Sequence, residues 1–175
     1  MRRALALVAL LSSGCGVSYA SEYDLFIDQG FAPEQQEQII EASARWTSAT
    51  DGDVKFNVHI GGIDTPTTKH QIFVITLANE STEAYCHDRA ALGCTENGKG
   101  LDVAFVRLQT SLPAAIDDGP EAPNDLAIQV ATHELGHAMG LSHDANGTVM
   151  APYVTQGSVI ITARDIAQFR AVRGL

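Results

Sequence analysis

The sequence has 175 residues, of which 21 are acidic and 11 are basic, so its formal net charge is −10 at pH 7. A chain of this size can form one domain with its own hydrophobic core, without help from a metal or a disulfide. Its acidity argues against a nucleic-acid partner, because phosphate backbones bind basic surfaces.

The N-terminus has the features of a bacterial export signal. Arg2 and Arg3 precede an apolar run at residues 4–11, and small residues follow. The run is too short to span a bilayer, so it fits the hydrophobic part of a signal peptide better than a transmembrane helix. We therefore expect residues 1–20 to be a signal peptide and residues 21–175 to form one exported domain.

Two cleavage sites compete in this leader. Residues 11–15 (LSSGC) resemble a lipobox, although Ser12 stands where leucine is usual, and residues 18–20 (SYA) fit the rule for an ordinary signal peptidase. The lipobox is the preferred interpretation. It implies an acylated Cys15 that would anchor an outer-membrane or cell-surface lipoprotein, and we expect membrane contact only through this anchor. The other site implies a secreted protein.

The first element expected after the leader is a helix that begins at Pro33. Proline near the first turn and acidic residues at the positive end of the helix dipole favour this start. An apolar face at helical spacing follows, formed by Ile39, Ile40, Ala42, Ser43 and Trp46. The turn signal at residues 51–53 should end the helix.

Three strands are expected beyond this helix. Residues 54–60 alternate apolar and polar side chains, as in a strand with one buried face. Residues 71–78 are apolar and β-branched enough for a buried central strand, and residues 101–108 predict a third strand.

Cys86 and Cys94 lie between the second and third of these strands, and they are the two thiols left once Cys15 is removed or lipidated. In an oxidising compartment they should form a disulfide, which would stabilise the fold by roughly 2 to 3 kcal/mol. Two free thiols are the alternative. Two cysteines alone are too few ligands for a zinc site.

Residues 110–124 contain proline, aspartate, glycine and asparagine, which indicates a surface loop. Asp117, Asp118 and Glu121 in this loop could hold calcium. A solvated acidic loop explains them more simply.

Two helices are expected in the C-terminal part of the chain. The first should begin near Asn124 or Asp125, where the loop gives way to an apolar pattern. The second should span residues 163–172, because Thr162 and Asp165 form a capping pattern at its start.

The stretch THELGHAMGLSH, residues 132–143, combines three histidines with a glutamate and a glycine. On a helix, His133 and His137 lie on one face, so both ring nitrogens can reach one metal ion. Glu134 lies beside them and can reach a water held by the metal without displacing it. That position suits a general base better than a ligand.

A catalytic zinc needs three protein ligands, and His143 could supply the third. Six residues of straight helix rise about 9 Å, so His143 could not return to the ion that binds His137 unless the chain turned. Gly140 lies where that turn is needed, because glycine adopts the left-handed conformation that ends a helix. The spacing therefore predicts one zinc ion with three histidine ligands and one open position.

This HExxHxxGxxH pattern resembles the zinc signature of the metzincin metallopeptidases. The resemblance implies an α+β, two-lobed zincin fold, with a small, mixed, twisted sheet, a backing helix, an active-site helix and a C-terminal helix. It also implies a cleft with zinc at its bottom, and a tight turn that places Met150 beneath the metal ligands.

Within this clan, residues 124–172 are most similar to the matrixins, the matrix-metalloproteinase type. Residues 124–132 resemble the lead-in to the matrixin active-site helix. Residues 150–152 (MAP) resemble the matrixin Met-Tyr-Pro, and residues 161–166 resemble the start of the last helix.

The matrixin resemblance assigns roles to residues around the methionine. It implies that Asp165 hydrogen-bonds to the methionine turn, and that Pro152 and Tyr153 form a wall of the S1′ pocket. Ala151 replaces the usual tyrosine after the methionine. Tyr153 lies one position too far along to be the tyrosine that approaches zinc in astacins and serralysins, so we do not count it as a ligand.

The family's second, structural zinc site is not visible in the sequence. His70, His87 and Asp88 are the available candidates, and surface side chains are the simpler interpretation. One catalytic zinc ion is therefore the cofactor that we expect.

The resemblance implies a zinc-dependent endopeptidase that hydrolyses peptide bonds through zinc-bound water, with Glu134 as the general base. A protein or peptide substrate would pair with a free edge strand between residues 90 and 100. We expect a monomer. Two alternatives stay open: a zinc hydrolase of small amides, and a non-catalytic, zinc-containing surface lipoprotein that acts as a binding module.

Overall fold

The protein is described by a computed structural model over residues 21–62, 70–77, 82–87, 91–97, 103–110, 126–146, 148–153 and 160–175. The expected signal peptide with Cys15, the acidic loop with Asp117, Asp118 and Glu121, and Asp88 lie outside these residues. Within the described ranges, no helix is both long enough and apolar enough to cross a membrane.

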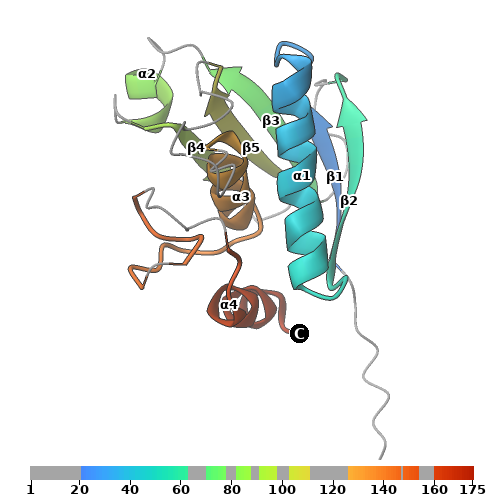
Figure 1. The fold of residues 1–175 in the computed structure, drawn as a ribbon, viewed down its shortest axis with the longest axis vertical. Coiled ribbons are helices and arrows are strands. Elements are labelled where there is room, and N and C mark those ends of the chain that lie inside the picture. Colours follow the sequence, from blue (N-terminus) through green and yellow to red (C-terminus); the bar gives the residue numbers. More distant parts are fainter. Residues whose placement is uncertain are drawn as a thin grey trace, which may run out of the picture.

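Five strands of the described chain form one sheet, in the order β2-β1-β3-β5-β4 (Figure 1). They are β1 (Ser21–Ile27), β2 (Val54–Ile60), β3 (Gln71–Leu77), β4 (Gly93–Asn97) and β5 (Val103–Gln109). β1 runs parallel to β2 and β3, and β3 runs parallel to β5, whereas β4 is antiparallel to β5. The sheet is therefore mixed, and β4 is the edge strand expected between residues 90 and 100.

Helices of the described chain pack on this sheet and at its end. They are α1 (Pro33–Ala49), α2 (Thr82–Cys86), α3 (Leu126–Ala138) and α4 (Ala163–Arg173). Figure 1 shows α1 and α3 side by side on one face of the sheet, where α1 contacts β2 and α3 contacts β4 and β5. α4 lies beyond the end of α3 (Figure 1). The α+β architecture with a mixed sheet is thus confirmed.

The helix expected from Pro33, the three expected strands and the two expected C-terminal helices are present, while β1 and α2 were not predicted. β1 buries Tyr23, Leu25 and Ile27 in the core that also contains Ile39 and Trp46 of α1, with more exposed side chains between them. This alternation is the period of a strand, and it begins directly after the expected cleavage site. The expected apolar face of α1 was wrong at Ile40, which is 38% exposed.

Trp46 joins α1 to α3. Its side chain is fully buried, and its indole Nε1 donates a hydrogen bond of 2.8 Å to the backbone oxygen of Thr132. A buried indole N–H without an acceptor would be costly, so this bond stabilises the packing of α1 against α3. The expectation that Trp46 belongs to the core is confirmed.

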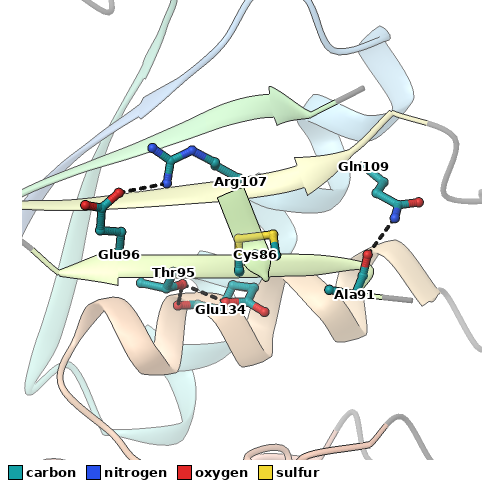
Figure 2. Close-up of a disulfide and its surroundings, with 8 residues drawn as sticks. Cys86, Ala91, Thr95, Glu96, Arg107, Gln109 and Glu134 are labelled. Carbon is teal, nitrogen blue, oxygen red and sulfur yellow. Dashed lines mark hydrogen bonds and ion pairs between the residues drawn. A yellow bond between two sulfur atoms is a disulfide. The ribbon is translucent and has the colours of Figure 1, made fainter. Parts of the chain in front are cut away.

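Cys86 and Cys94 form the expected disulfide, which joins the end of α2 to β4 (Figure 2). On β5, Arg107 forms an ion pair of 3.2 Å with Glu96 of β4, and its guanidinium lies 4.9 Å from the ring centroid of Tyr85 on α2. The short α2 is therefore attached to the edge of the sheet by both a covalent and a noncovalent contact.

Candidate active site

His133 and His137 lie one turn apart on α3 and direct their rings to the same place. Each Nδ1 is 2.8 Å from a backbone oxygen, that of Val149 for His133 and that of Leu141 for His137. A carbonyl oxygen only accepts hydrogen bonds, so both Nδ1 atoms carry the proton and both Nε2 atoms keep a lone pair. The two Nε2 atoms are 3.0 Å apart.

His143 reaches the same place because the chain turns just after α3. Gly140 has a φ of 97°, in the region that favours glycine. Beyond this turn, the ring centroid of His143 lies 4.7 Å from that of His137 and 5.3 Å from that of His133. One potential ligand atom from each ring lies within 4.8 Å of the other two. The turn at Gly140 thus brings the three histidines together, as their spacing predicted.

The three imidazoles suit a metal ion in their chemistry as well as in their position. Burial lowers the pKa of His133 to about 4 and also lowers the pKa of His137, so both rings are neutral at physiological pH. Neutral imidazoles are the form that binds zinc. Within the described residues, this is the one group of three or more His, Cys, Asp or Glu side chains that could share an ion, and neither His70 nor His87 belongs to it.

Glu134 follows the first histidine and lies beneath β4 (Figure 2). The residue is 5% exposed, and the hydroxyl of Thr95 donates a hydrogen bond of 2.7 Å to its Oε2. Burial raises the pKa of Glu134 to about 7, although the Thr95 hydroxyl acts in the opposite direction. A carboxyl group that titrates near neutral pH can both take up and release a proton.

A cleft of about 680 Å³ contains this group of side chains. Its walls come from β4 and the two residues before it, from α3, from His143 and from Val149 and residues 151–153, together with Cys86 of α2. Pro152 and Tyr153 both line the cleft, and Tyr153 is 80% exposed, which places it at the rim. The histidines and Glu134 therefore lie where a molecule in the cleft could reach them.

Met150 packs against α3. It is fully buried, and its Sδ approaches Gly136, the helical residue between the first two histidines. A Cβ at position 136 would overlap Met150 Sδ and would lie 3.1 Å from Cζ2 of Trp46. The absence of a side chain at Gly136 is therefore what lets the methionine approach the helix so closely.

Among the described residues, Asp165 makes no hydrogen bond to the methionine turn, contrary to the prediction. Its Oδ2 accepts hydrogen bonds from the backbone N–H of Thr162 at 2.8 Å and from its hydroxyl at 2.7 Å. Its buried Oδ1 has no hydrogen-bond partner among the described residues. The turn is held instead by Thr148, whose Oγ1 accepts from the N–H of Met150 at 3.1 Å. The Asp165 carboxylate is therefore used to cap the start of α4.

The three convergent histidines, the helix that carries two of them and the mixed sheet above define a metzincin-type zinc metallopeptidase. The sequence model of the matrixin family matches residues 26–174, and the chain belongs to this family. Both the metzincin and the matrixin predictions are thereby confirmed.

A solved structure with a similar fold is archaemetzincin from Methanopyrus kandleri, with a TM-score of 0.57 and 14% sequence identity. The match covers 95% of this chain and 100% of that one. At this identity the likeness concerns the fold alone. A comparison with curated protein sequences found no significant match.

Three residues that shape the site were not predicted from the sequence. Thr95 contacts Glu134, and the side-chain amide of Asn97 donates a 3.0 Å hydrogen bond to the backbone oxygen of His137. Their partners lie 39 and 40 residues away, so no local spacing indicates these contacts. Gly136 did leave a signal, because a glycine inside a helix costs about 1 kcal/mol relative to alanine and often marks close packing.

Replacing Gly136 by alanine should lower the free energy of unfolding by about 1 to 3 kcal/mol, because the added methyl group displaces the buried Met150. Without this contact, glycine to alanine in a helix would be stabilising. Urea unfolding of the metal-free proteins measures the difference. In a Met150→Ala background the same substitution should cost less, and an equal cost in both backgrounds would contradict the packing explanation.

The stability of the metal-free protein should depend on pH through Glu134. Its pKa rises from 4.5 to about 7 on folding, so its contribution is complete below pH 4.5 and is lost as pH rises through 7. Glu134→Gln should therefore unfold at a similar urea concentration near pH 4, but should be more stable than the wild type above pH 7, by about 3 kcal/mol. A difference that stays constant across this range would refute the assignment.

Proposed function

We propose that this metallopeptidase is an endopeptidase that cuts peptide bonds within proteins, with Glu134 as its general base. The observation that carries the proposal is the buried Glu134 carboxyl group beside three convergent histidines in an open cleft. A purely structural metal site needs no base and tends to close its fourth position. Membership in the matrixin family supports a protein or peptide as the substrate.

The free edge of β4 is the surface that we assign to the substrate's main chain. A 3.1 Å hydrogen bond from the N–H of Gln109 to the backbone oxygen of Leu92 sets the pairing with β5. Because antiparallel pairing alternates, Gly93, Thr95 and Asn97 direct their backbone groups to the open edge. An extended peptide can pair with these groups whatever its sequence. Selectivity would then come from the rest of the cleft.

The chain's own residues account for the proton transfers of peptide hydrolysis. Zinc held by the three histidines would polarise the substrate carbonyl and make the attacking water more acidic. Glu134 takes a proton from this water and delivers it to the leaving amine. Its burial favours the protonated form between these two transfers. The bonds from His133 and His137 to backbone oxygens keep both rings in one orientation throughout.

Pro152 and Tyr153 are our candidates for a wall of the S1′ pocket. Both line the cleft, and they follow directly on the turn that carries Met150. Their position beside the three histidines would put them close to the residue that follows the cut.

Glu134→Gln should lower kcat/KM for peptide cleavage by about 10²- to 10⁴-fold, because the substitution removes the base and keeps the shape. Cleavage of casein and of a peptide library measures the loss. Glu41→Gln, which changes an exposed glutamate on α1, is the matched control and should behave as the wild type. A chelator should abolish activity, and Zn²⁺ should restore it.

The same assay distinguishes the alternatives. A wild type that holds zinc but cleaves neither casein nor peptides would favour a zinc-containing binding module. Turnover of small amides alone would favour a small-amide hydrolase. Full activity in the Glu134→Gln variant would remove Glu134 from the mechanism.

Export is part of the same proposal, with residues 1–20 as the signal peptide and residues 21–175 as the catalytic domain. Arg2, Arg3 and the apolar run support the signal, and the LSSGC stretch supports lipid attachment at Cys15. Intact-mass measurement of the protein from a bacterial host should show an acylated chain that begins at Cys15. A chain that begins at Ser21 would indicate secretion, and an uncleaved chain in the cytoplasm would contradict export.

A further inference from the structure

Strand β4 is bound to α3 by hydrogen bonds from two side chains, those of Thr95 and Asn97. The hydroxyl of Thr95 lies 2.7 Å from Oε2 of Glu134 and 3.0 Å from the backbone oxygen of the same residue. The side-chain amide of Asn97 donates to the backbone oxygen of His137. Figure 2 shows Thr95 between the strand and the Glu134 side chain. The edge strand is thus in direct contact with the helix that carries the base and two histidines.

The shorter of the two Thr95 contacts is the one that concerns catalysis. Its length fits a hydroxyl that donates to an ionised carboxylate. Within the described residues, no other group hydrogen-bonds to the carboxylate of Glu134. Thr95 therefore fixes the place of Oε2 and leaves Oε1 without a competing partner.

We propose that Thr95 is a positioning residue, which aligns the Glu134 carboxylate with a peptide bound along β4. The inference rests on the proposed endopeptidase function. The backbone of Thr95 faces the open edge of β4, and its hydroxyl donates a hydrogen bond to the Glu134 carboxylate. Thr95 can therefore contact both the main chain of a bound peptide and the general base. A free glutamate side chain samples several rotamers, and a misplacement of about 1 Å can lower a rate by about 100-fold.

Thr95→Val tests the proposal, because valine keeps the shape of threonine and lacks the hydroxyl. We expect kcat to fall about 10- to 100-fold, with KM within about twofold of the wild type. Thr95→Ser, which keeps the hydroxyl, should restore most of kcat. Thr47→Val is the matched control, because the Thr47 hydroxyl bonds within α1 to the backbone oxygen of Ser43. It should leave kcat unchanged.

A double-mutant cycle shows whether Thr95 acts through Glu134. In a Glu134→Gln background, Thr95→Val should cause little further loss, because the group that it positions is gone. Zinc content and thermal unfolding of each variant report on the metal site and the fold without reference to activity. Both should match the wild type.

The possible results separate the two proposals. Wild-type kcat in Thr95→Val, a loss confined to KM, no rescue by serine, or an equal loss in the Glu134→Gln background would each overturn the positioning role. Loss of zinc or of the folded state in both Thr95→Val and Thr95→Ala would make Thr95 a structural residue, and would overturn it as well. Absence of any peptide cleavage by the wild type would instead refute the endopeptidase function.

Discussion

The change of backbone direction at Gly140 determines how the three histidines can meet. On a straight helix, a residue six positions beyond His137 would lie about 9 Å further along the axis. With its φ of 97°, Gly140 ends the helix and has two effects on the histidines. It returns His143 to the other two rings, and it places the backbone oxygen of Leu141 where it accepts the Nδ1 proton of His137. The turn at this glycine thereby brings in the third imidazole and orients the second.

Packing on both sides of α3 holds the helix in the position that this turn requires. Trp46 bonds to a backbone oxygen of the helix from α1, and Met150 fills the space left by Gly136. Close packing around the helix also removes water from Glu134, and this burial raises the pKa of Glu134. A buried ionisable group lowers the stability of the metal-free protein. Active sites retain such groups because proton transfer near neutral pH needs them.

Sequence spacing predicted those parts of the site that lie within one stretch of chain. Residues 133–143 carry the three histidines, Glu134 and the turn at Gly140, and their spacing along one stretch of chain relates them to one another. The bond from Thr95 to Glu134 spans 39 residues and depends on the register of the sheet, which local patterns do not determine. The hydrogen bond predicted for Asp165 was wrong for another reason. Its carboxylate accepts hydrogen bonds from Thr162, three residues earlier in the chain, and makes none to the described residues of the methionine turn.

Edge strands expose unpaired backbone groups and are therefore prone to pair with other chains. β4 is held on both faces, by the disulfide at Cys94 on one side and by Thr95 and Asn97 on the other. A strand that is already ordered loses little entropy when a peptide pairs with it, so more of the contact energy is available for binding. Thr95 and Asn97 also connect β4 to α3. The hydrogen bonds that order this edge strand would therefore also determine where a paired peptide lies relative to Glu134.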